Sequence, residues 1–134
     1  MSDWNTQVIT EFRANAGKVA QFGDAPVVIL HTIGARSGDV REIPLVALVE
    51  SDAMFVFASK GGAPTNPDWF HNLVANPQIT VEFGTESFAA TLAQLPAAEA
   101  AAKLNAQAVL MPQFGQYVES AAPRVIPAFS IKRN

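Results

Sequence analysis

The chain of 134 residues contains no cysteine and only two histidines, His31 and His71, which lie far apart in the sequence. Without cysteine there can be no disulfide, thiolate zinc site, iron–sulfur cluster or cysteine nucleophile. Two distant histidines do not give the ligand spacing of a metal site, so we expect no metal. No serine–histidine–aspartate arrangement and no pair of hydrolytic carboxylates can be argued from the spacings. These absences exclude the common hydrolytic sites.

Long apolar runs are also missing, although hydrophobic residues make up 49% of the chain. No stretch is long enough to predict a membrane-spanning helix, and the first ten residues do not resemble a signal peptide. The composition therefore predicts a cytoplasmic protein with one domain over residues 1–134 and no association with a membrane. The net charge of −3 argues against nucleic acid as a partner.

Positive charge is scarce in the middle of the chain. Between residues 19 and 102 the only cations are Arg36, Arg41 and Lys60. Each borders a glycine turn, either at Gly38 or at Gly61-Gly62. An acidic chain that reserves its central cations for such turns has the means to hold a small anion there. Ordinary solvated turn charges would give the same pattern, so both interpretations stay open at this point.

Hydrophobic periodicity predicts about six strands and three to four helices. Tight turns between most of the strands favour antiparallel pairing, and strands that are apolar on both faces favour a closed or nearly closed barrel. Pro44 lies inside one strand and suggests that this strand is an edge or contains a bulge. The expected strands are 27–30, 42–50, 54–58, 79–83, 87–93 and 125–131. The first expected helix ends by residue 17, and the others cover about 67–75, 96–111 and 112–122.

The segment 59–77 combines several features of a ligand site. A strand ends at Lys60, and two glycines leave backbone N–H groups uncovered. Asn66 is expected to cap a helix whose first residue is Pro67. That helix carries Trp69, which its spacing assigns to the core. The glycines could equally serve a loop that needs positive φ angles.

In its sequence motifs the chain resembles the deazaflavin-dependent nitroreductase family, a branch of the split β-barrel flavin and deazaflavin oxidoreductases. The resemblance extends over most of the chain and rests on five segments in a fixed order, which together are specific. They are Thr32–Gly38, Arg41–Leu45, Ala58–Gly62, Asn66–Pro77 and Arg124–Pro127.

The resemblance implies a split β-barrel, mainly β with flanking helices, that binds coenzyme F-420, a deazaflavin with a phosphodiester and an oligoglutamate tail. Reduced F-420 would transfer a hydride to a small electron-poor acceptor, such as a quinone, a nitroaromatic compound or an activated enone. A separate dehydrogenase would reduce the coenzyme again. An FMN-binding barrel and a deazaflavin carrier without catalysis are the alternatives, and the protein is expected to be a monomer or a homodimer.

The resemblance also implies functional residues. Ser59 and Tyr117, the only tyrosine, are the catalytic candidates, as hydrogen-bond or proton donors. Ala35 stands where relatives often carry a base, which implies weaker binding of the tail. Phe114 stands where they often carry a tyrosine, which argues against nitroimidazole reduction. The contacts implied for the anionic tail are Arg36, Ser37, Arg41 and Lys60. Those implied around the rest of the coenzyme are Ala35, Glu42, Ile43, Pro44, Leu45, Val46, Phe57, Ala58, Ser59, Asp68, Trp69, Phe70, His71, Asn72 and Phe114.

Overall fold

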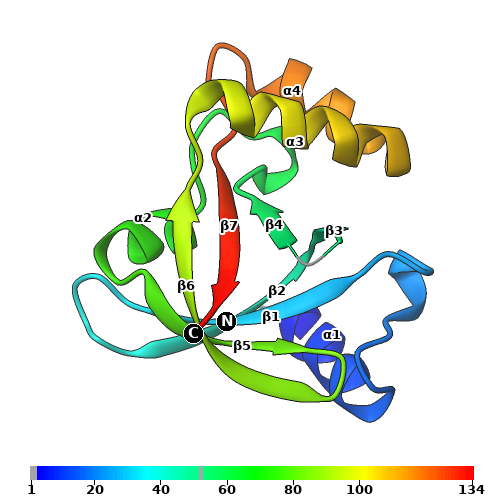
Figure 1. The fold of residues 1–134 in the computed structure, drawn as a ribbon, viewed down its shortest axis with the longest axis vertical. Coiled ribbons are helices and arrows are strands. Elements are labelled where there is room, and N and C mark those ends of the chain that lie inside the picture. The colour runs from blue at the N-terminus through cyan, green and yellow to red at the C-terminus, as the bar shows by residue number, and fades with distance from the viewer. Residues whose placement is uncertain (1–2, 52) are drawn as a thin grey trace.

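A computed structural model describes residues 3–51 and 53–134 and contains one strongly curled antiparallel sheet (Figure 1). The sheet has seven strands in the order β2-β1-β5-β6-β7-β4-β3, and every neighbouring pair is antiparallel. The strands are β1 (Val27–Ile33), β2 (Val40–Val46), β3 (Leu48–Glu50), β4 (Ala53–Phe57), β5 (Gln78–Phe83), β6 (Glu86–Gln94) and β7 (Ala128–Arg133). The expected antiparallel split barrel is confirmed.

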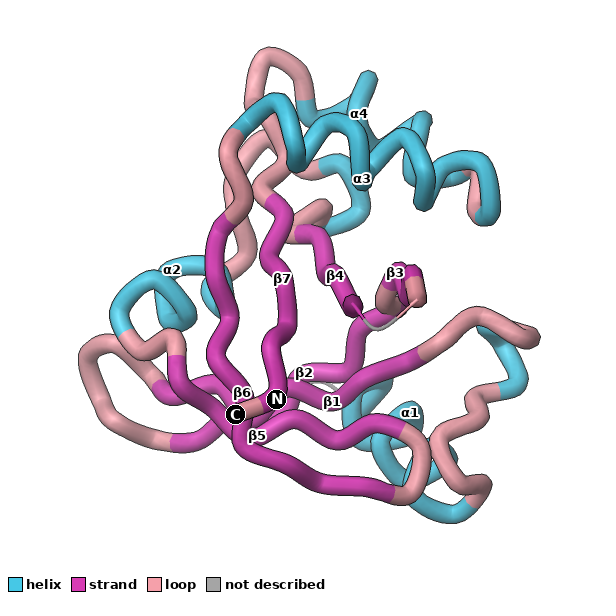
Figure 2. The backbone as a smooth tube through the Cα atoms, viewed as in Figure 1, coloured by secondary structure: helices cyan, strands magenta, loops and turns pink. Residues whose placement is uncertain are grey.

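The two edges of the sheet are joined by a single residue. β2 and β3 are the edge strands, yet they follow one another directly along the chain (Figure 2). Only Ala47 lies between them. The sheet must therefore curl until its edges approach one another, which produces the half-barrel. Ala47 is buried, and its N–H donates to the carbonyl of Pro26 at 2.9 Å. This break divides the strand expected over 42–50 into two. β2, which contains Pro44, is an edge strand, so the prediction made from this proline is confirmed.

Four helices and two short 3-10 turns surround the barrel (Figure 1). α1 packs outside β1 and β2, α2 contacts β1, and α3 and α4 pair beside β7 and the turn η2. No helix in the described part of the chain is long and apolar enough to cross a membrane. Their bounds are α1 (Asp3–Ala14), η1 (Ala20–Phe22), η2 (Lys60–Gly62), α2 (Asp68–Ala75), α3 (Ala97–Leu110) and α4 (Gln113–Ala121).

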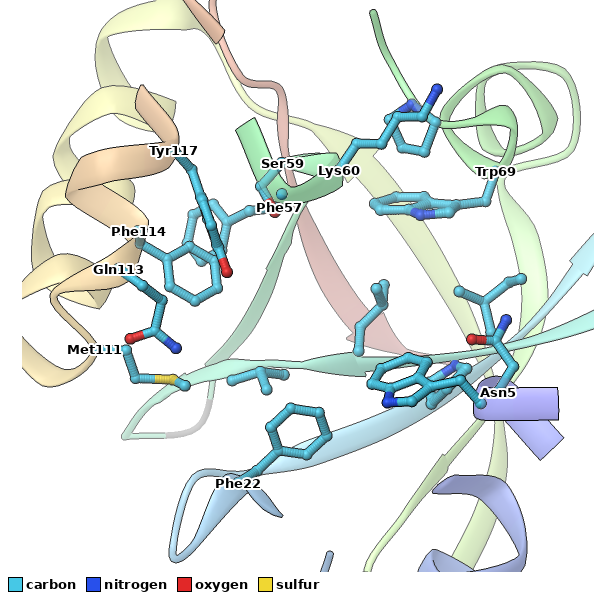
Figure 3. A pocket seen from close by; sticks show the side chains of 17 residues that line it. Asn5, Phe22, Phe57, Ser59, Lys60, Trp69, Met111, Gln113, Phe114 and Tyr117 are labelled. Atoms are coloured by element: carbon cyan, nitrogen blue, oxygen red, sulfur yellow. The ribbon is translucent and has the colours of Figure 1, made fainter. Parts of the chain in front are cut away.

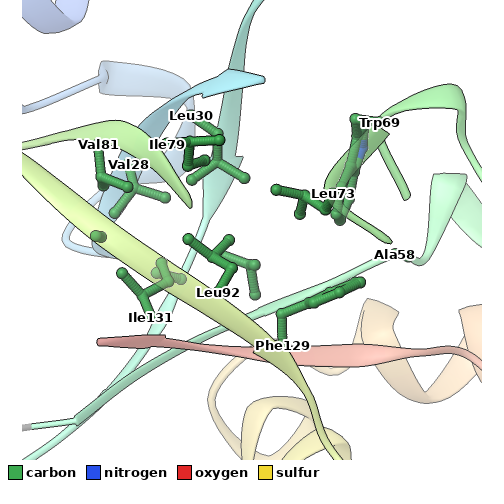
Figure 4. Close-up of a cluster of buried hydrophobic side chains, with 13 residues drawn as sticks. Val28, Leu30, Ala58, Trp69, Leu73, Ile79, Val81, Leu92, Phe129 and Ile131 are labelled. Atoms are coloured by element: carbon green, nitrogen blue, oxygen red, sulfur yellow. The ribbon is translucent and has the colours of Figure 1, made fainter. Parts of the chain in front are cut away.

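β1 is apolar on both faces because both faces are covered. Val28 and Leu30 point into the barrel core, whereas Val27 and Ile29 pack under Phe12 of α1. The barrel core also receives two residues of α2, Trp69 and Leu73, which lie near Phe129 of β7 (Figure 4). Trp69 and Phe129 have ring centroids 6.1 Å apart, so the core assignment of Trp69 is confirmed. Burial of this face fixes α2 against the barrel.

The start of α2 differs from the expectation. Asn66 does not cap the helix; Pro67 occupies the cap position, and no side chain caps it. The Asn66 carboxamide oxygen instead accepts a hydrogen bond of 2.7 Å from Nη1 of Arg124. The carboxamide oxygen that the local pattern predicts as a helix cap is therefore bound by a charged donor from a distant segment.

Candidate functional site

Three adjoining cavities form a groove along β2 and α2. The apolar cavity, of about 450 Å³, and the middle cavity, of about 570 Å³, share Ile43 and Trp69. The middle cavity and the polar cavity, of about 460 Å³, share Arg41, Asp68 and Asn72. The shared lining residues place the three cavities next to one another along the two elements.

Aromatic and aliphatic side chains line most of the apolar cavity (Figure 3). β2 supplies Pro44, Leu45 and Val46 as one wall, because the end of this edge strand faces the groove. Phe57 of β4 and Trp69 of α2 lie deeper, and α4 contributes Phe114 and Tyr117. The Phe114 ring contacts Phe57 and Tyr117, with centroids 6.0 and 5.2 Å away. The cavity is thus suited to a flat apolar group.

Ser59 and Lys60 bring polarity to this apolar end. They precede two glycines in η2, where Gly61 and Gly62 have φ angles of 62° and 84°. A side chain on Gly62 would place its Cβ 2.7 Å from Cβ of Ser120 in α4. The glycines therefore serve a left-handed backbone that packs closely against α4. Lys60 Nζ donates to Thr65 Oγ1 at 3.2 Å, across the same loop.

The polar cavity is built on the turn between β1 and β2, which contains Ala35, Arg36 and Ser37. The Ser37 hydroxyl accepts from the Asp39 N–H at 3.1 Å, and Asn72 Oδ1 accepts from the Ala35 N–H at 3.0 Å. Asn72, almost fully buried in α2, thereby fixes the turn against the helix.

Arg36 and Arg41 are the cations of this cavity. Both side chains are exposed, and neither forms an ion pair within residues 3–51 and 53–134. Among the other basic side chains, Arg13, Lys103 and Arg133 are each paired with glutamate, whereas Lys60 and Arg124 form no ion pair with the described residues either. Two unpaired guanidinium groups beside Ser37 can bind a phosphate or carboxylate group. This geometry favours the anion interpretation of the central cations.

Most of the sequence-predicted residues meet in this groove, but two do not line it. Ala58 is fully buried in the barrel core. Phe70 lies against Phe129 and His71, with centroids 5.8 and 5.1 Å away. Lys60 lines the apolar cavity, whereas Arg36 and Arg41 line the polar one. The remaining predicted residues line at least one of the three cavities: Ala35, Ser37, Glu42, Ile43, Pro44, Leu45, Val46, Phe57, Ser59, Asp68, Trp69, His71, Asn72, Phe114 and Tyr117.

Sequence reasoning missed the contribution of the N-terminal segment. Asn5 of α1 and Phe22 of η1 line the apolar cavity (Figure 3). Trp4 of α1 also lines it, and the Trp4 and Phe22 rings meet edge to face with centroids 6.3 Å apart. Trp4 remains 47% exposed. Met111 and Gln113, at the α3–α4 junction, were also missed. Only the packing of α1 and α3 against the barrel brings these residues to the groove.

A charged cluster fastens α1 to the barrel beside this groove. Arg13 donates to Glu82 at 2.6 and 3.1 Å and to Glu42 at 2.7 Å. His31 Nε2 lies 2.7 Å from Glu82, so this half-buried histidine is hydrogen-bonded. Hydrogen bonds from Arg13 and then from His31 lower the pKa of Glu82 below its usual value. His31, Glu42 and Glu82 offer metal-ligand atoms within 4.8 Å of one another, but Arg13 already donates hydrogen bonds to both carboxylates.

Comparison with known proteins identifies the family to which the chain is similar. The family model described as F-420H(2)-dependent quinone reductase matches residues 4–131. An F-420H(2)-dependent quinone reductase of Mycobacterium tuberculosis is 37% identical over 82 residues, which are 60% of this chain and 55% of the relative. The chain therefore spans about half the length of the curated relatives it matches.

Two solved structures are similar over most of their length. One, described as an F-420-H2 dependent reductase (FDR-A), is 31% identical, covers 80% of this chain and 94% of its own, and gives a TM-score of 0.71. The other, described as a domain-swapped dimer, is 30% identical, covers 97% and 98%, and gives 0.73. The coenzyme for which the family is named is the expected deazaflavin rather than FMN. The chain belongs to the F-420H(2)-dependent quinone reductase family.

Proposed function

We propose that this chain binds coenzyme F-420 along the groove and reduces a small, planar, quinone-type acceptor at the apolar end. One observation carries the proposal: the groove is aromatic at one end and offers two unpaired arginines at the other. A planar ring with an anionic tail requires this distribution of apolar surface and charge. When bound in its reduced form, the coenzyme supplies a hydride. The family membership of the chain supports the same activity.

The residues of the groove fit the two parts of the coenzyme. Pro44, Leu45 and Val46 offer apolar side chains and backbone groups to the ring, opposite Trp69. Arg36, Ser37 and Arg41 offer two guanidinium groups and a hydroxyl to phosphate and carboxylate oxygens. Asp68, His71 and Asn72 line the same polar cavity from α2. We assign Lys60 to an anionic group nearer the ring, because it lines the apolar cavity.

Ser59 and Tyr117 are the hydroxyl-bearing side chains that line the apolar cavity. In our proposal the Tyr117 hydroxyl, which points into the cavity in Figure 3, donates a hydrogen bond or a proton to the acceptor oxygen. Ser59 holds a polar atom of the ring or of the acceptor. Phe57, Phe114 and Trp69 exclude water from the space between the reactants, which protects the hydride from side reactions.

Several partners follow from this proposal. Nitroaromatic compounds and activated enones are further candidate acceptors because they are also electron-poor and planar. In this proposal the coenzyme leaves the groove oxidised, so a separate dehydrogenase reduces it again. The domain-swapped dimer among the similar structures supports a homodimer for this chain.

Titration and turnover test the proposal together. We expect the purified protein to quench F-420 fluorescence with a lower dissociation constant than it shows for FMN. Equal or reversed affinities would contradict the coenzyme assignment. Reduced F-420 should then be oxidised in the presence of menadione only when the protein is added. Tight binding without this oxidation would indicate a carrier instead of a reductase.

A further inference from the structure

Arg124 lies between α4 and β7, outside the residues that line the groove. Its guanidinium makes five hydrogen bonds, and all of them reach the segment 58–66. Nη1 donates to the carbonyl of Ala58 at 3.0 Å and to Asn66 Oδ1 at 2.7 Å. Nη2 donates to the carbonyls of Ser59 at 2.9 Å and Ala63 at 2.7 Å, and Nε donates to Ala63 at 3.0 Å. One side chain therefore holds both ends of this segment.

The charge of Arg124 has no carboxylate partner among the described residues. The guanidinium is half-buried and directs its donors at carbonyl and carboxamide oxygens. The planar fork of arginine suits several acceptors at fixed angles, whereas a lysine would offer one freely rotating ammonium. The arrangement is therefore specific to arginine.

The segment that Arg124 holds is the loop that brings polar groups to the apolar cavity. Ser59, Lys60 and Gly61 line that cavity. The loop also rests on α4: a Cβ on Gly62 would lie 3.1 Å from the Cα of Tyr117. Arg124 follows α4 by a few residues, so its bonds connect the loop with the helix that carries Tyr117.

We propose that Arg124 is a positioning residue, which holds the segment 58–66 in its ligand-binding shape before the coenzyme arrives. Binding then requires little ordering of Ser59 and Lys60, and the affinity rises because that entropic cost is removed in advance. The inference rests on the proposed function of the groove, but the ordering of the loop can be measured on the protein without coenzyme.

Two substitutions separate the geometry of the fork from its charge. Arg124→Gln removes both, whereas Arg124→Lys keeps the charge and loses the fork. We expect both variants to weaken F-420 binding by roughly tenfold or more, given several lost charge-assisted hydrogen bonds. We also expect faster hydrogen exchange confined to residues 58–66 in the free protein. Arg133→Gln is the matched control, because it removes an exposed arginine from β7 and should leave both measurements unchanged.

A second measurement covers the case in which Arg124→Gln does not fold. Asn66→Ala removes one acceptor of the guanidinium and should produce a smaller change in the same direction. A double-mutant cycle that combines Asn66→Ala with Lys60→Ala should give non-additive changes in F-420 affinity, because a displaced Lys60 contributes less to binding. Wild-type affinity in Arg124→Lys, or additive effects in the cycle, would overturn the inference. Failure of the wild-type protein to bind F-420 would instead overturn the proposed function, while the exchange result would still report on the loop.

Discussion

At the scale of single residues, the groove places few polar atoms at its apolar end. Tyr117 is half-buried, and its ring is held edge-on against Phe114. Its position on α4 faces Ser59 and Lys60 of the glycine loop, on the same cavity. A hydroxyl held by packing of its ring can act on an acceptor without contributing much to the binding of the coenzyme.

Tyr117→Phe tests this separation. We expect slower oxidation of reduced F-420 by menadione, by about two to four orders of magnitude as for the loss of one proton donor, with little change in coenzyme affinity. Steady-state kinetics and fluorescence titration of the same preparation give the two values. Ser120→Ala, on the same helix but outside the lining of the cavity, is the control. Loss of coenzyme binding in Tyr117→Phe would show that the residue only closes the cavity.

At the scale of elements, the function depends on how loops and helices are attached to the barrel. The turn η2 packs against α4, and α1 is fastened to β2 and β5 through Arg13. Both attachments border the groove, because η2 carries Lys60 and Gly61 and α1 carries Trp4 and Asn5. Changes at these attachments should therefore affect stability and binding together.

The contact between η2 and α4 is tested with two neighbouring glycines. Gly61 and Gly62 both have positive φ angles, but only Gly62 lacks space for a side chain. Gly61→Ala should cost about 1 kcal/mol of unfolding free energy from the backbone alone. Gly62→Ala should cost roughly 2–3 kcal/mol, because the backbone penalty is joined by a clash with α4. Denaturant unfolding compares them, and equal losses would mean that the loop does not rest on the helix.

The attachment of α1 predicts a dependence on pH. The pKa of Glu82 is lowered in the folded protein, chiefly by the hydrogen bonds from Arg13. A carboxyl group with a lowered folded-state pKa stabilises the protein above its unfolded pKa, and this stabilisation is lost as the pH falls through the folded-state value. Glu82→Gln should therefore be less stable than wild type at pH 7, by about 1 kcal/mol for such a pair. The difference in stability between Glu82→Gln and wild type should shrink as the pH falls below 4.5, the ordinary pKa of a glutamate carboxyl group.

Chemical denaturation at several pH values measures this difference. Glu86→Gln is the matched control, because Glu86 pairs with Arg133 on an exposed surface and does not touch α1. A constant difference between Glu82→Gln and wild type across the acid range would show that the carboxylate charge of Glu82 plays no part in the attachment.

At the scale of the whole molecule, one core serves both the barrel and the groove. Phe129 of β7 is buried and contacts Trp69 and Phe70, with ring centroids 6.1 and 5.8 Å away. Trp69 in turn lines the apolar and middle cavities. The barrel interior is therefore also the support for one wall of the groove.

Phe129→Ala should lower the unfolding free energy by about 3–5 kcal/mol, as for other large-to-small changes in well-packed cores. It should also weaken F-420 binding, because Trp69 loses the ring against which it packs. Val74→Ala, on the exposed face of α2, should change stability by less than about 0.5 kcal/mol. Thermal or denaturant unfolding gives the first result. A Phe129→Ala protein with unchanged affinity would separate the core from the groove.

Much of this protein was determined by local sequence. Apolar runs and apolar alternation located the strands, although the last one begins at Ala128 and not at residue 125. Pro44 marked an edge, and the helix after Pro67 ends at Ala75 as predicted. The scarcity of central cations already pointed to Arg36 and Arg41, which the structure leaves unpaired. These features follow from the neighbours of each residue along the chain, so a single sequence is enough to predict them.

Tertiary structure decided which of these residues meet. Pairing of β1 with β5 and of β6 with β7 curls the sheet, and the curl brings Trp4 and Phe22 to the same cavity as Tyr117. The fold also makes the Asn66 side chain a hydrogen-bond acceptor for Arg124 instead of a cap for α2. Such contacts join residues far apart in the chain, and their energies depend on packing that no local pattern contains. The sequence by itself therefore determined the elements and the charges, and only the fold determined the groove that they share.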